Sequence, residues 1–238
     1  PVLSSDGEGR IVVAWARDMD GNVLTADDIV IYTSDWVSNG WTPAQPVISA
    51  PGAISELSLS LANGSAVIGV VTNSPDLGKT IRLSFNSLGR WSPANVIGIV
   101  RSDLSDVSVI MQSTGVGLVV WNEGSNSNVS RLVSVEATSA GIRGETVVAD
   151  GVTGLVDLSL TATDQSIYLT WISDDGSHIN YGKREVGQWA SPISTKLEHG
   201  ISNRLITLAE GDYRRLLTFH QATVDKQPAV MFIPIQID

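Results

Sequence analysis

Regularly spaced acids are the residues of this sequence with the clearest chemical potential. Glu56, Asp106 and Asp157 each precede an aliphatic–Ser–aliphatic triplet, and they follow one another at intervals of 50 and 51 residues. This spacing predicts that equivalent strands bring the three carboxylates around one axis. Because carboxylates held close together tend to recruit a cation or a cationic partner, these three are candidate ligand-binding residues.

A second group of acids lies in the loop from Arg17 to Asp28. The four candidate metal ligands are Asp18, Asp20, Asn22 and Asp27. Their order resembles part of a calcium loop, and calcium prefers about six to eight oxygen ligands. Ala16 occupies the usual first ligand position. Calcium is therefore the one candidate cofactor, and the alternative is that these Asp-Gly segments are only turns.

Trp36 is the tryptophan that departs from the pattern of the others. It is expected in the turn after a strand, within TSDWVSNGW, so exposure and contact with a ligand are predicted for it. The remaining tryptophans are expected to pack in the core, because they recur at equivalent places. They are Trp15, Trp41, Trp91, Trp121, Trp171 and Trp189.

A repeat of about fifty residues positions all of these side chains. Its first strand carries the triplet after the acid, and its second strand ends in a large residue. These large residues are Trp15, Val71, Trp121, Trp171 and Phe219, at intervals of 56, 50, 50 and 48 residues. The fourth strand opens with Trp41, Trp91 or Trp189, and Ile142 takes that place in the third copy. Strands alternate apolar and polar residues between Gly- and Asp-rich turns.

Periods of this length are typical of propellers and solenoids. The sequence predicts an all-β fold, a β-propeller of five four-stranded antiparallel blades, with a last blade of three strands. One domain is expected over 1–238, with repeats at approximately 1–50, 54–99, 104–148, 155–197 and 201–238. A five-bladed ring closing through Phe219, Met231 and Phe232 is favoured over a piece of a larger ring. A closed ring predicts a monomer.

Composition excludes several classes of function. The net charge of −10 argues against nucleic-acid binding, which needs a basic surface. The chain lacks cysteine, which excludes disulfides and thiolate chemistry. No apolar run is long enough for membrane insertion. His178, His199 and His220 lie at unrelated places in their repeats, so no metal or triad spacing is recognised.

The first repeat, VVAWARDMDGNVLTADDIVIYTSDWVSNGWTPAQPVI, resembles blades of large secreted or surface-anchored bacterial proteins. Such blades are similar to those of sialidase-like propellers with degraded Asp-box motifs, here Ser34-Asp35 to Trp41 and Ser84 to Trp91. The resemblance implies a β-propeller and an extracellular or cell-surface location. The set of arginines, tyrosine and acids that a sialidase needs is not assignable from the sequence.

These observations favour a non-catalytic binding or structural module of a larger extracellular protein, with a protein or glycan as its partner. Two alternatives stay open. One is a glycan-binding lectin of the five-bladed type, and the other is a sialidase-like or other glycoside hydrolase.

Overall fold

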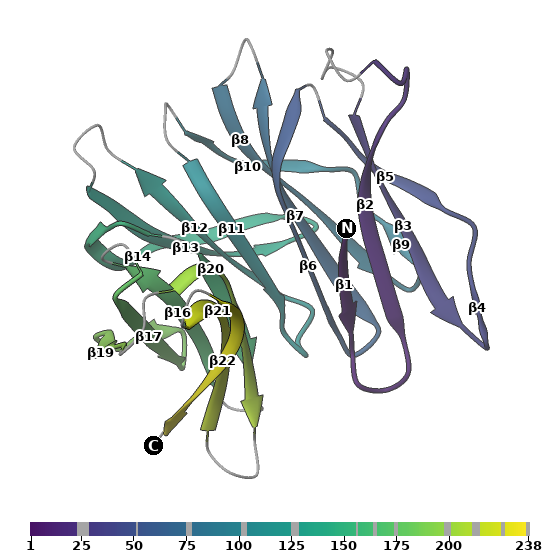
Figure 1. The fold of residues 1–238 in the computed structure, drawn as a ribbon. Helices are drawn as coiled ribbons and strands as arrows, with labels where there is room; N and C mark the ends of the chain where they lie inside the picture. Colours follow the sequence, from purple (N-terminus) through teal and green to yellow (C-terminus); the bar gives the residue numbers. More distant parts are fainter. Residues whose placement is uncertain are drawn as a thin grey trace. The chain divides into compact units, whose positions relative to one another are not determined.

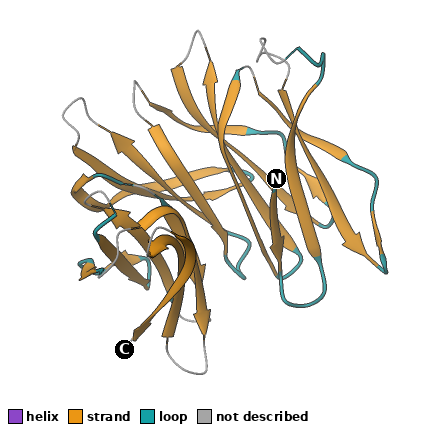
Figure 2. Cartoon of the chain, viewed as in Figure 1, coloured by secondary structure: helices purple, strands orange, loops and turns teal. Residues whose placement is uncertain are grey.

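The computed structural model describes most of the chain. The described residues are 1–22, 29–50, 52–74, 78–100, 104–124, 129–155, 157–163, 166–173, 176–197, 201–210, 215–224 and 227–236. Every regular element among them is a strand, as Figure 2 shows. Consistent with this, the described residues hold no helix of the length and apolarity that crossing a membrane requires.

The strands form five antiparallel sheets that follow one another along the chain (Figure 1). The first holds β1 (Val2–Ser5), β2 (Ile11–Asp18), β3 (Ile29–Val37), β4 (Gly40–Trp41) and β5 (Gln45–Ala50). The second holds β6 (Ala53–Ala62), β7 (Ser65–Ser74), β8 (Gly78–Ser87), β9 (Arg90–Trp91) and β10 (Asn95–Val100). The third holds β11 (Leu104–Met111), β12 (Gly117–Gly124), β13 (Val129–Thr138) and β14 (Gly141–Thr153). The fourth holds β15 (Leu158–Ala162), β16 (Ile167–Ser173), β17 (His178–Glu185), β18 (Gln188–Trp189) and β19 (Ile193–Lys196). The fifth holds β20 (Ile201–Glu210), β21 (Arg215–Val224) and β22 (Gln227–Gln236).

Each of the first four sheets has four strand positions. In the first, second and fourth sheets the fourth position is interrupted, and both of its pieces pair with the third strand. In the third sheet one continuous strand, β14, fills it. The fifth sheet stops at three strands in the part of the chain that the structure describes. This plan confirms the predicted blades, including the three-stranded last one.

Contacts divide the chain into two compact units. Unit 1 contains 1–124 and 134–146, and unit 2 contains 125–133 and 147–238. The units are described separately below, and the single domain and the closed ring stay predictions.

Serine side chains join the first strands of neighbouring sheets within each unit. In unit 1, Ser58 Oγ accepts a hydrogen bond from the Val109 amide at 3.1 Å, and Ser60 Oγ accepts one from Met111 at 2.9 Å. In unit 2, Ser159 Oγ accepts one from Thr207 at 3.1 Å. A strand at a sheet edge leaves amide groups without ladder partners. The serine of the repeated triplet supplies such a partner, which gives the repeat a structural reason.

The space between the second and third sheets is closely filled. Val67, Val70 and Val71 of β7 are fully buried. A Cβ added at Gly69 would lie 2.6 Å from Val109 Cγ1, closer than real carbon contacts allow. Here glycine is required by packing, because β7 and β11 approach too closely for a side chain.

Candidate functional site

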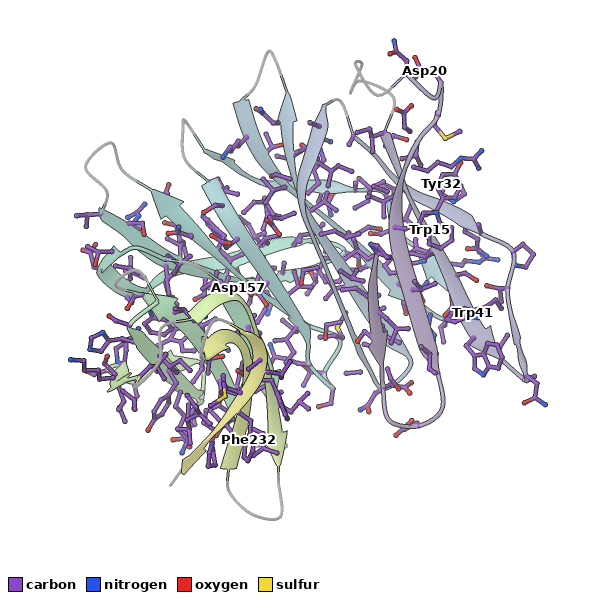
Figure 3. The ribbon with its side chains drawn as sticks, viewed as in Figure 1. Trp15, Asp20, Tyr32, Trp41, Asp157 and Phe232 are labelled. Carbon is purple, nitrogen blue, oxygen red and sulfur yellow. The ribbon has the colours of Figure 1, made fainter. Side chains whose placement is uncertain are left out.

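The three predicted inner acids all stand where a first strand begins. Glu56 lies near the start of β6 and is exposed, and Asp106 lies near the start of β11 and is half-buried. Asp157 directly precedes β15 (Figure 3). Glu56 and Asp106 belong to unit 1 and Asp157 to unit 2. The prediction that all three surround one axis therefore stays a prediction.

Asp106 has an unusual backbone and a well-defined carboxylate. Its φ is 53°, and the pairing of β11 with β12 shifts register around it, between Ser105 and Val107. Such β-bulges re-aim a side chain, and strained backbone gathers at functional sites. The Ser105 hydroxyl donates to Asp106 Oδ2 at 2.7 Å, while Asn122 Nδ2 donates to Ser105 Oγ at 3.1 Å. Asn122 is only 8% exposed, so this chain of hydrogen bonds fixes the carboxylate.

Glu56 and Asp106 lie at the same end of adjacent strands. The serine contacts advance by two residues on both strands, so β6 and β11 run side by side in the same direction. The Lys79 ammonium also lies at this end, donating to the Leu104 carbonyl at 2.9 Å. We call Glu56, Asp106 and Lys79 the acidic end of unit 1. Two carboxylates and a cation can perform general acid–base chemistry on a bound substrate.

The side chains of two predicted calcium ligands, Asp18 and Asp20, accept hydrogen bonds from backbone amides of their own turn. Asp18 Oδ1 accepts from the Gly21 amide at 3.0 Å, and Asp20 Oδ1 accepts from the Asn22 amide at 2.6 Å. Asp27 lies outside the described residues. Within the described ranges no group of three or more acidic, histidine or cysteine side chains could hold a metal ion. Calcium stays a prediction.

Trp36 does not lie in the turn where the sequence placed it. It belongs to β3, where it pairs with Trp41 and is half-buried. The two indoles meet edge to face, with ring centroids 5.4 Å apart. Trp41 is the more exposed, at 48% (Figure 3). The strand continues because the hairpin turn is made by Ser38 and Asn39, whose φ angles are 48° and 78°.

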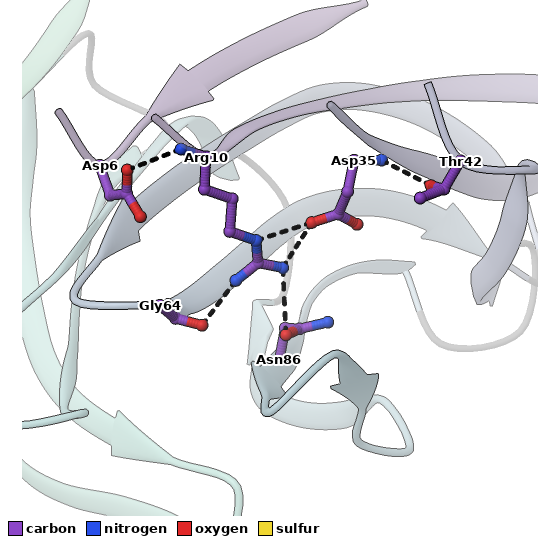
Figure 4. A network of polar contacts seen from close by, with 6 residues as sticks. All are labelled: Asp6, Arg10, Asp35, Thr42, Gly64 and Asn86. Carbon is purple, nitrogen blue, oxygen red and sulfur yellow. Dashed lines mark hydrogen bonds and ion pairs between the residues drawn. The ribbon is translucent and has the colours of Figure 1, made fainter. Parts of the chain in front are cut away.

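A network of hydrogen bonds around Arg10 lies at the end of unit 1 opposite the acidic end, and it was not predicted from the sequence (Figure 4). Arg10 Nε donates to Asp35 Oδ1 at 2.7 Å, and Nη2 lies 2.6 Å from the same oxygen. Arg10 Nη1 donates to the Gly64 carbonyl at 2.6 Å, and Nη2 donates to Asn86 Oδ1 at 3.3 Å. In the two degraded Asp-box segments Trp36 pairs with Trp41 and Asn86 pairs with Trp91, so Asp35 and Asn86 do not occupy equivalent places and the repeat gives no signal for this network. Arg10 thereby joins the first sheet to the second.

Replacing Arg10 by Ala is expected to lower the free energy of unfolding by about 1–3 kcal/mol. The substitution leaves Asp35, Asn86 and the Gly64 carbonyl without their shared donor, and the cost is moderated because the ion pair is partly exposed. Arg143 is exposed on β14, so Arg143→Ala serves as the control and should change stability by about 0.5 kcal/mol or less. Urea unfolding measures both variants, and equal stability would contradict a structural role for the network.

Comparisons with known proteins define the fold class. No protein-family model and no curated protein sequence matches the chain. Solved structures do match, and together with the five sheets they show that the chain is an all-β protein of the β-propeller class.

Three of the similar structures show how sequence identity, TM-score and coverage vary among the matches. A protein of unknown function from Dyadobacter fermentans is 12% identical with a TM-score of 0.68, over 98% of this chain and 77% of that one. A Hadza microbial sialidase is 10% identical with a TM-score of 0.66, over 99% of this chain and 57% of that one. The α-L-arabinofuranosidase of Podospora anserina, in complex with cellotriose, is 11% identical with a TM-score of 0.50, over 77% and 64%. This chain thus spans little more than half of the sialidase.

These similarities correct the expected function. The non-catalytic binding or structural module was the leading prediction, and it is contradicted, because the sialidase and the arabinofuranosidase that share the fold are glycoside hydrolases. The alternative of a sialidase-like or other glycoside hydrolase agrees better with them. The predicted resemblance to sialidase-like propellers is confirmed at the level of the fold.

Proposed function

We propose that this chain acts as a glycoside hydrolase, with the acidic end of unit 1 as its reaction site. The observation that carries the proposal is Asp106, a half-buried carboxylate on a strained bulge, oriented by Ser105. The fold supports it, since it is shared with a sialidase and an arabinofuranosidase. Because one fold hosts many functions, the fold alone would not suffice.

Glycosidic bonds are commonly cleaved by two carboxyl groups on either side of the bond, one of which protonates the leaving oxygen. In this proposal Asp106 is one of the two groups and Glu56, on the adjacent strand, is the other. Lys79 would balance the charge of the pair, because its ammonium is held at the same end by the Leu104 carbonyl.

A reaction by two carboxylates is favoured over one that uses a tyrosine nucleophile. Among the tyrosines that the structure describes, Tyr168 is 3% exposed in the interior of β16, and Tyr32 stacks on Trp15 with centroids 6.1 Å apart (Figure 3). Both are engaged in packing. Tyr181 belongs to β17 and packs against the core of unit 2.

Hydrolysis of a panel of chromogenic glycosides tests the proposal. The panel includes sialosides, arabinofuranosides and xylosides, together with polymeric arabinan, which suits the extracellular location that we expect. Release of the chromophore that disappears in both Asp106→Asn and Glu56→Gln supports the assignment. A chain that is folded but silent on every substrate overturns it.

A further inference from the structure

We propose that the outer edge of the fifth sheet binds a second copy of this chain, so that the protein forms a two-fold symmetric dimer through β22. In the part of the chain that the structure describes, β22 has one neighbouring strand, β21, and its other edge is open (the yellow strand in Figure 1). An open strand edge is a template for pairing with another chain. Neither the fold comparison nor the proposed reaction assigns a partner to this edge.

The pairing of the fifth sheet shows which backbone groups face the open edge. The Thr207 amide donates out of this sheet, to a serine of β15, so it does not bond to β21. Thr207 lies opposite Thr218, and Thr218 lies opposite Ile233, so Thr218 and Ile233 bond to each other across β21 and β22. Successive residues of a strand direct their N–H and C=O groups to opposite sides. Val230 and Phe232 therefore direct theirs to the open edge.

Two prolines delimit this open segment symmetrically. Pro228 and Pro234 share the outward direction, and each is three residues from Met231. Proline has no N–H, so it is tolerated where the N–H would face away from the neighbouring strand. With a two-fold axis at Met231, Val230 of one copy lies opposite Phe232 of the second copy. Both outward N–H groups between the prolines then meet carbonyl groups of the second copy.

The side chains at this edge are apolar and exposed. Val230 is 77% exposed and Phe232 is 62% exposed (Figure 3). Phe232 contacts Phe219 of β21, with ring centroids 6.3 Å apart. Leu208 of β20 belongs to the same face of the sheet and is 53% exposed. Pairing of two copies extends this apolar face across the two-fold axis and removes part of its surface from water.

Two features favour a second copy over a further sheet of the propeller as the occupant. The serine that joins the first strands of neighbouring sheets belongs to the repeated triplet, and the fifth repeat lacks this triplet. In addition, β22 carries no charged residue. A two-fold interface brings identical residues together, so a chain with a net charge of −10 can form one only at a neutral surface. The β22 edge meets this condition.

Sedimentation velocity of the full chain over a range of concentrations tests the proposal. We expect a reversible equilibrium between the monomer and a species of twice its mass. The Kd should be on the order of 1–100 μM, because the interface is small. The monomer that a closed ring predicts is the opposite result.

Substitutions separate the contribution of the apolar face from that of the backbone. Phe232→Lys brings two ammonium groups close to the two-fold axis, so the dimer should weaken at least about tenfold. Val230→Pro removes an outward N–H and leaves the pairing with β21 intact, so the dimer should weaken similarly. Val230→Thr keeps this N–H and should keep the dimer. Leu88→Lys, at a residue that is 97% exposed in the β8–β9 hairpin, is the control for the added charge.

Three results would overturn the proposal. They are a chain that stays monomeric at about 100 μM, a dimer that persists in the folded Phe232→Lys and Val230→Pro variants, or a dimer that Leu88→Lys weakens equally. Open-ended oligomers in place of a dimer would also contradict a two-fold interface. Circular dichroism verifies folding of each variant before sedimentation.

Discussion

Replacement of Asp106 by Asn is expected to lower kcat by about 10²–10⁴-fold on the best glycoside of the panel, the range typical for loss of a general acid or base. Asn is nearly isosteric, accepts the Ser105 hydrogen bond through its amide oxygen, and tolerates the positive φ of 53°. The variant should therefore keep the fold while losing the ability to donate or accept the proton. Initial rates over the accessible pH range measure the effect.

The variant Asp106→Gly distinguishes a chemical role of the Asp106 carboxylate from a role of Asp106 in the stability of the fold. Asp106→Gly relieves the backbone strain at a positive φ, so its stability should be retained or slightly raised. Its activity should nevertheless fall as far as that of Asp106→Asn. The control is Asp150→Asn, at an exposed carboxylate of β14, which should have the same stability and the same activity as the unaltered chain. A fully active and stable Asp106→Gly protein would remove Asp106 from the reaction.

Replacement of Trp121 by Ala is expected to lower the free energy of unfolding by about 3–5 kcal/mol, the cost of emptying a core site of an aromatic ring. Trp121 is 4% exposed and lies on β12, opposite Val107. A loss of this size should lower the Tm by roughly 10 °C in a chain of this length.

The matched control is Trp41→Ala, because Trp41 is 48% exposed and contacts Trp36 at its edge. Its cost should be about 1 kcal/mol. The contrast tests the difference between a second-strand tryptophan and a hairpin tryptophan. Similar losses in the two variants would mean that exposure does not separate these two classes of tryptophan.

The repeat could be recognised from the sequence because its signals are local. The aliphatic–Ser–aliphatic triplet predicted the first strand of three repeats, and β6, β11 and β15 form at those residues. The acids at 56, 106 and 157 were placed correctly at the starts of first strands, since the triplet after each acid marks the register. The three-stranded last sheet was also foreseen, because only three alternating segments follow residue 200.

Local sequence signals also gave the wrong position for the turn after β3. Trp36 follows Ser and Asp, which favour turns, so the strand was ended too early. The structure extends β3 to Val37 because the tight turn belongs to Ser38 and Asn39. Comparison with Leu88-Gly89, which makes the same turn in the second sheet with φ angles of 53° and 79°, could have set the register.

The sequence by itself therefore determined the blades, their order along the chain and the acids at the starts of the first strands, since strand period and turn chemistry act over a few residues. Only the tertiary structure decided the rest. Arg10 finds Asp35, Gly64 and Asn86 at separations of 25, 54 and 76 residues. These contacts join one side chain to three distant segments and recur at no fixed period, so no local pattern of the sequence marks them.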